Sequence, residues 1–125
     1  SGKQIPEESN QITLDDDILS VFHDDQYVGL AYKSGKEKQP YEIALYTTGG
    51  REKATFTLDF AFDHVAISKD QIFVYNEKEV GIYTVKGYCR YRGTIKEGNV
   101  ENIFRLSGNR YMVVLDSGTE TIRLQ

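Results

Sequence analysis

Short apolar runs follow one another along the chain, and each is bounded by Asp, Asn, Gly, Ser or Lys. The runs are rich in β-branched and aromatic residues, which favour strands. No window of the chain keeps the apolar spacing of a long helix. We therefore predict an all-β fold. The predicted strands cover residues 21–22, 27–32, 43–47, 54–58, 65–67, 72–75, 80–85, 91–95, 103–106, 111–115 and 121–124.

An internal repeat links the middle of the chain to the segment that follows it. Residues 42–47 read EIALYT and residues 79–84 read EVGIYT, and each run is followed at the same spacing by a glycine and a Thr–aliphatic pair. The matched positions, all 37 residues apart, are Glu42 and Glu79, Gly50 and Gly87, Thr57 and Thr94, and Leu58 and Ile95. Residues 120–124 repeat the opening of the unit. The shared spacing indicates a repeated supersecondary unit.

A turn pair precedes an apolar strand upstream of each unit. The three pairs are Asp25-Gln26, Asp70-Gln71 and Asn109-Arg110. This element aligns Tyr27 with Ile72 and with Tyr111. One unit is then four antiparallel strands, which we call a, b, c and d in chain order. Its size and makeup are those of a β-propeller blade.

The predicted strands form three blades in the order d-abcd-abcd-abc, within a domain of residues 11–125. The first d strand is residues 12–14, which match the Thr–aliphatic pairs in type. The preceding residues 1–10 are expected to be a disordered tail, and the opening Ser1-Gly2 is typical of a cloning scar. Three blades are too few to close a ring. The chain is therefore expected to be part of a longer propeller, or one half of a six-bladed homodimeric ring.

The run DQIFVYNEKEVGIYTVKG, residues 70–87, resembles the blades of bacterial WD40-like and quinoprotein-like propellers. In particular it is similar to uncharacterised, membrane-anchored propeller proteins of Gram-positive bacteria, whose domains have no known function. The resemblance implies a propeller fold. It also favours an extracytoplasmic location over a cytoplasmic one, with the anchor in a segment outside this sequence. The chain has no tryptophan and no Trp-Asp pair. The resemblance thus implies no quinone or other cofactor and carries over no catalytic residue.

The composition of the chain limits the classes of partner that it is expected to bind. The chain has 125 residues, one cysteine and a formal net charge of −4. The length fits one domain, and the single Cys89 excludes an internal disulfide framework or a cysteine-rich metal site. An acidic surface argues against a nucleic-acid partner. No apolar run approaches the ~18 residues that a membrane span needs, so we expect no membrane insertion by this part of the protein.

Acidic residues recur in the predicted connections between strand d and the next strand a. Asp16, Asp59 and Asp63 lie there, and His64 follows directly. These connections share one face of a propeller, where loops from several blades meet. Clustered carboxylates on that face bind a cation or a basic peptide. The alternative is a solvated acidic rim that discourages aggregation.

The candidate chemistry for an enzyme is sparse. Residues 116–119, Asp-Ser-Gly-Thr, resemble the signature of aspartic proteases, in which two such loops bring two carboxylates together. The repeat instead makes this stretch a turn between strands b and c, where Asp and Gly are ordinary residues. The two histidines, His23 and His64, fall at unmatched positions of the repeat. We therefore predict no catalytic residue and no metal site.

The sequence as a whole favours a non-catalytic binding or scaffolding module that recognises a protein, peptide or glycan through its blade-face loops. One alternative is a small-ligand carrier in which the strands close as an up-and-down barrel. That alternative predicts no repeat of 37 residues. A hydrolase with a site centred on Asp116 is the other alternative.

Overall fold

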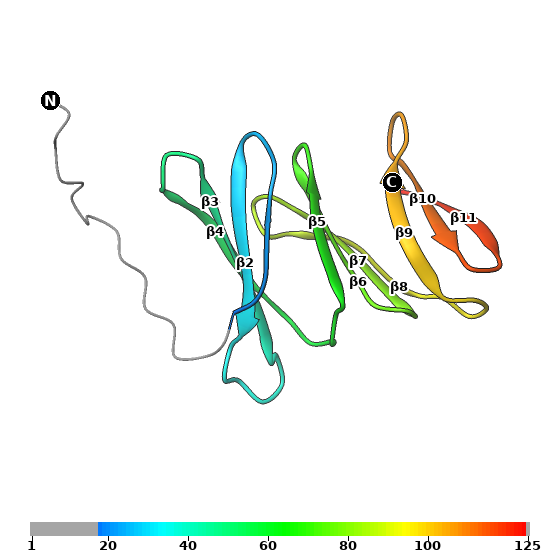
Figure 1. The fold of residues 1–125 in the computed structure, drawn as a ribbon, viewed down its shortest axis with the longest axis horizontal. Helices are drawn as coiled ribbons and strands as arrows, with labels where there is room; N and C mark the ends of the chain where they lie inside the picture. The colour runs from blue at the N-terminus through cyan, green and yellow to red at the C-terminus, as the bar shows by residue number, and fades with distance from the viewer. Residues whose placement is uncertain (1–17, 125) are drawn as a thin grey trace, which may run out of the picture.

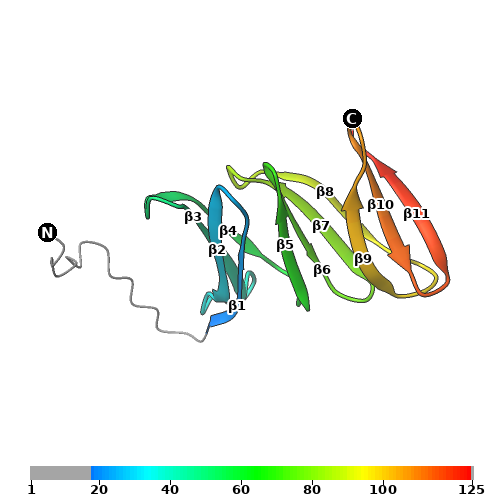
Figure 2. The same ribbon diagram turned by 45° about the horizontal axis from the view of Figure 1, so that its top comes forward.

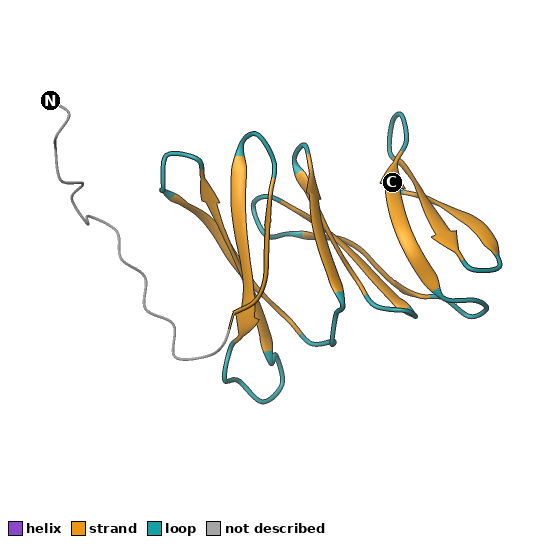
Figure 3. Ribbon diagram, in the orientation of Figure 1, coloured by secondary structure: helices purple, strands orange, loops and turns teal. Residues whose placement is uncertain are grey.

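The computed structural model describes residues 18–124, which form eleven strands and no helix (Figure 3). The first sheet contains β1 (Ile18–His23), β2 (Tyr27–Lys33), β3 (Tyr41–Thr47) and β4 (Glu52–Leu58). The second contains β5 (His64–Ser68), β6 (Gln71–Tyr75), β7 (Glu79–Thr84) and β8 (Cys89–Thr94). The third contains β9 (Val100–Arg105), β10 (Arg110–Leu115) and β11 (Gly118–Arg123).

Each sheet pairs its strands antiparallel and in chain order, and the three sheets stand one behind another (Figures 1 and 2). The all-β prediction and the grouping abcd, abcd, abc are confirmed for the described strands. The predicted d strand at residues 12–14 lies outside the described residues. The barrel alternative is wrong for residues 18–124, because the strands fall into three separate sheets of four, four and three strands, none of them closed.

Apolar side chains fill both spaces between the sheets. Successive residues of a strand point to opposite faces, so one strand serves two cores when both faces are covered. In β6, Ile72 and Val74 pack against the first sheet, whereas Phe73 and Tyr75 pack against the third. All five residues of β6 are buried. The middle sheet is therefore buried on both faces, and its central strands read as continuous apolar runs.

The first core places Ile43 and Leu45 of β3 against Ile72 and Val74 of the second sheet. The second core places Tyr111 and Val113 of β10 against the other face of that sheet, and the rings of Phe73 and Tyr111 meet edge to face at 5.6 Å. Full burial of one aliphatic side chain contributes about 1.5–3 kcal/mol. Stacking of the sheets is thus the main source of stability.

The predicted alignment of Tyr27 with Ile72 is wrong by one residue. Thr47 and Thr84 are equivalent in the 37-residue repeat, and their ladder partners are Tyr27 and Gln71. Ile72 therefore corresponds to Val28. Because side chains alternate along a strand, a shift of one residue exchanges the two faces of the sheet. The corrected register decides which face of the first sheet looks away from the stack.

The stack has two ends of different makeup. The turn end carries the tight turns β1–β2, β3–β4, β5–β6, β7–β8 and β9–β10. The connection end carries the two sheet-to-sheet connections, residues 59–63 and 95–99, together with the β2–β3, β6–β7 and β10–β11 turns. Hydrogen bonds tie the connections to neighbouring turns, as in Ile95 N–H to Lys78 O and Asp116 N–H to Asn99 O.

Candidate functional site

Polar side chains at the connection end are largely engaged in holding that end together. The Oδ1 atom of Asn76 accepts hydrogen bonds from the backbone N–H groups of Lys78 and Glu79, at 2.8 and 2.7 Å. Its Nδ2 donates to the carbonyl of Ala61, in the connection between the first two sheets. Asn76 therefore orders its own turn and fastens it to the preceding connection.

In the last sheet, Asp116 likewise fastens its turn to the preceding connection. Its Oδ1 accepts the backbone N–H of Asn99 at 2.8 Å, and its Oδ2 accepts Asn99 Nδ2 at 2.9 Å. These bonds favour the charged carboxylate and lower the pKa of Asp116. Asp116 lies in the two-residue β10–β11 turn, where the repeat places it. A carboxylate held ionised by Asn99 is poorly suited to sharing a proton as the protease signature requires.

The structure describes three of the four residues predicted to bind a ligand, and their contacts differ. Asp16 lies outside the described residues. Asp59 pairs with Arg92 of β8, whose Nη1 lies 2.8 Å from Asp59 Oδ1. The exposed Asp63 donates its backbone N–H to Tyr75 O, and the ring of His64 stacks on Tyr75 at 5.0 Å. Among residues 18–124, no three His, Cys, Asp or Glu side chains gather closely enough to hold a metal ion.

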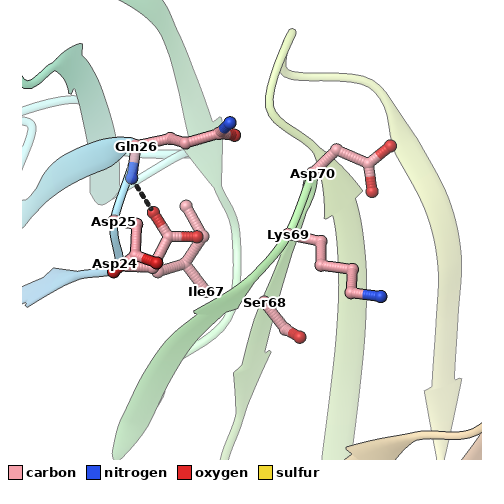
Figure 4. A pocket seen from close by; sticks show the side chains of 7 residues that line it. All are labelled: Asp24, Asp25, Gln26, Ile67, Ser68, Lys69 and Asp70. Atoms are coloured by element: carbon pink, nitrogen blue, oxygen red, sulfur yellow. Dashed lines mark hydrogen bonds between the residues drawn. The ribbon is translucent and has the colours of Figure 1, made fainter.

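The turn end presents an open groove of about 590 Å³ between the β1–β2 turn and the β5–β6 turn (Figure 4). Its lining residues are Asp24, Asp25, Gln26, Ile67, Ser68, Lys69 and Asp70. Asp24 shapes one wall, because its Oδ1 accepts the backbone N–H groups of Gln26 and Tyr27 at 2.8 and 2.9 Å. Gln26 extends from that wall towards the opposite turn (Figure 4).

A smaller groove of about 210 Å³ continues on the other side of the β5–β6 turn. Ser68 and Lys69 line both grooves, so this turn is a ridge between them. Lys69 has a φ of 58°, the left-handed conformation that a tight turn requires and that an L residue adopts at some cost. On the far side, Arg105 of β9 lies 3.1 Å from Asp70 through Nη1 and Oδ1.

The large groove carries three carboxylates and one amine. Asp70 is paired with Arg105, and Asp24 is used by its own turn. None of the three ion pairs found among residues 18–124 involves Asp25 or Lys69. The sequence contained a signal for this site, since the turn pairs Asp25-Gln26, Asp70-Gln71 and Asn109-Arg110 recur in each unit. What it did not show is that successive turns lie side by side.

The class of protein is now defined as an all-β chain of repeated, stacked antiparallel sheets. A family model, the family of unknown function DUF5711, matches residues 1–124, and the chain belongs to that family. A comparison with curated proteins gives no match. None of residues 18–124 forms a helix of the length and apolarity that crossing a membrane requires.

Proposed function

We propose that this chain is a non-catalytic binding module of the β-propeller type, and that its turn end takes a basic peptide. The observation that carries the proposal is the pair of adjoining grooves that share Ser68 and Lys69. The basic part of an extended peptide would occupy the larger groove and the rest would cross the β5–β6 ridge into the smaller one, whose charged lining residues are Lys69 and Arg105. Carboxylates outnumber amines in the larger groove, which favours a ligand with Lys or Arg side chains.

The propeller-type arrangement is supported by the way the sheets repeat. The first strands of the first and second sheets, β1 and β5, lie side by side. The same strand order recurs in each sheet, and each space between sheets holds an apolar core. In this proposal further sheets, from a second copy or from a longer parent chain, complete the ring. The groove itself is contained within one copy.

A peptide rather than a glycan is favoured by the lining of the large groove. Its seven residues include one apolar side chain, Ile67, and no aromatic ring on which a sugar would stack. The remaining side chains offer carboxylate, amide, hydroxyl and ammonium groups. Such groups pair with the backbone and the charged side chains of an extended peptide.

The test uses three synthetic peptides of equal length, one rich in lysine, one rich in glutamate and one neutral. Backbone amide shifts of the labelled protein are followed by NMR from micromolar to millimolar peptide. The lysine-rich peptide is expected to bind saturably and to shift the amides of residues 24–26 and 67–70 first. Asp25→Lys should weaken this binding by about tenfold or more, as expected for loss of a charged contact.

Glu97→Lys is the matched control, because it makes the same charge change in an exposed connection-end residue. It should leave the affinity for the lysine-rich peptide unchanged. Equal weakening by both substitutions would mean that net charge alone attracts the peptide. That result, or saturable binding that shifts only connection-end amides, would contradict the proposed site. So would the absence of saturable binding by all three peptides.

A further inference from the structure

Among residues 18–124, no further sheet covers the two outermost sheet faces of the stack, and both faces carry exposed apolar side chains. Five of the six exposed large hydrophobic residues among residues 18–124 belong to the first or the last sheet. They are Ile18, Leu19, Val21, Val28 and Phe104. Exposed apolar surface that is concentrated in this way marks an interaction site more often than isolated residues do.

The pairing of β1, β2, β3 and β4 shows which residues of the first sheet point away from the stack. Ile43 and Leu45 pack against the second sheet, so residues of the opposite parity look away from the stack. Partners across a ladder share a face, which places one central row on the outward side: Val21, Leu30, Ala44 and Thr55. The row nearer the turn end is His23, Val28, Tyr46 and Glu52. We call these two rows, with Tyr32 and Glu42, the leading face.

The repeat shows what the leading face is built to meet. Val28 and Leu30 correspond to Ile72 and Val74 of the second sheet, which are fully buried because the first sheet covers them. Val28 is 36% exposed and Leu30 is partly exposed. The first sheet thus carries the same apolar pattern, and none of the three described sheets covers it. Its natural occupant is another sheet of the same repeat.

The last sheet offers a complementary surface. Tyr111 and Val113 of β10 face the second sheet, so the outward rows are Phe104, Met112 and Thr121, and Asn102, Val114 and Thr119. Arg110 and Arg123 pair across the ladder at the turn end of this face. We call this set the trailing face. Two like charges directly opposite each other are unfavourable unless an anion lies between or above them.

In both interfaces between the described sheets, the turn ends of the two sheets lie together. When the leading and trailing faces are placed in the same way, opposite charges come together at their turn ends. Glu52, which begins β4, lies at the turn end of the leading face, and Arg110 and Arg123 lie at the turn end of the trailing face. The two arginines line a hollow of about 410 Å³. Arg110 is partly held by Ser107, 3.1 Å from Nη2 to Oγ, whereas Arg123 forms none of the three ion pairs among residues 18–124.

We propose that the trailing face of one copy docks on the leading face of a second copy, with Arg123 of one against Glu52 of the other. Two such contacts, related by a twofold axis, close a ring of six sheets. Apolar contact between Phe104 and Met112 on one side and Val21, Val28 and Leu30 on the other supplies most of the binding energy. The arginine–carboxylate contact sets the register. This inference rests on the propeller-type arrangement proposed above, but not on the peptide groove.

The experiment is the solution mass of residues 1–125 by light scattering, from micromolar to millimolar protein. A dimer is expected, and Arg123→Glu should raise its dissociation constant by about tenfold or more. Glu52→Arg should do the same, and combining the two substitutions should restore the dimer. Phe104→Asp should abolish it. Lys96→Glu, an exposed connection-end residue outside both faces, is the control and should leave the dimer intact.

A monomer at every concentration would overturn the proposal and would assign the two faces to sheets of a longer parent chain. An open polymer, or a dimer that the combined variant fails to restore, would overturn it as well. Circular dichroism of each variant checks that the sheets remain folded. Peptide binding by monomeric Phe104→Asp separates the two proposals, because the groove lies within one copy and should still bind.

Discussion

Arg92 of β8 pairs with Asp59 across the junction of the first and second sheets, with Nη1 and Oδ1 2.8 Å apart. The other arm of the guanidinium reaches Glu79 at 2.9 Å, and its carbon lies 4.1 Å from the centroid of the Phe60 ring. The Arg92 side chain thereby holds the connection between the first and second sheets against the second sheet. This contact explains why an arginine occurs in the exposed edge strand β8.

Removing that side chain should loosen the junction. Arg92→Ala is expected to lower the free energy of unfolding by about 1–2 kcal/mol, the sum of two exposed ion pairs and a cation–π contact. Arg92→Lys should recover part of the loss, because an ammonium cannot reach both carboxylates as a planar guanidinium does. Chemical denaturation measures the change. Arg90→Ala, in the same strand, is the control, and an equal loss there would contradict the assignment.

The ring of Phe22 in β1 leaves no room for a side chain at Gly29, its partner in β2. A Cβ atom at position 29 would lie 2.2 Å from Cζ of the buried Phe22 ring. Gly29→Ala should therefore destabilise the fold by about 1–3 kcal/mol, the usual cost of overpacking a core. Thermal unfolding of Gly29→Ala with and without Phe22→Leu tests this, since the smaller side chain should recover part of the stability. If Gly29→Ala were as stable as the parent, the ring would have to move freely.

Tyr111 carries a buried hydroxyl for which residues 18–124 provide no hydrogen-bond partner, although its ring is fully buried against the second sheet. An unsatisfied buried hydroxyl costs about 1–3 kcal/mol. Tyr111→Phe should thus raise the free energy of unfolding by about 1 kcal/mol, while Tyr111→Leu should lower it by removing the ring that meets Phe73. Denaturant titration of both variants separates the two effects. A loss of stability in Tyr111→Phe would show that the hydroxyl is paired.

The bond from Asp116 to Asn99 should make stability depend on pH in a defined direction. The folded state lowers the pKa of Asp116 from its ordinary value of 3.8, so the stabilising contribution is present above that value. It is lost as pH falls through the lowered pKa. The melting temperature of the parent should therefore exceed that of Asp116→Asn at neutral pH, and the difference should disappear in acid.

Asn99→Ala provides the control for this pH effect, because it removes the side-chain donor to Asp116. In that background the difference between Asp116 and its Asn variant should shrink. The backbone N–H of Asn99 still donates to Oδ1, so some dependence on pH should remain. A difference that grows in acid would contradict the assignment of the bond as stabilising the ionised carboxylate.

The sequence by itself determined the local structure and its grouping. Alternating or continuous apolar runs define strands, and the glycines and Asx residues between them define turns, because both depend on nearest neighbours along the chain. The 37-residue spacing from Glu42 to Glu79 therefore predicted the four-stranded unit. The Asp116 turn was assigned correctly for the same reason, since the repeat supplied its equivalent.

Only the tertiary structure decided which residues meet across sheets. The register of β2 differed by one residue from the aligned sequence, because ladder pairing is fixed by contacts that no local pattern records. The sequence did not predict that Asp59, in the connection after the first sheet, lies 2.8 Å from Arg92 of the second sheet. The grooves along the turn end also depend on how the sheets stack, since each is lined by turns of two different sheets. Their residues are distant in sequence, and only packing brings such residues to one surface.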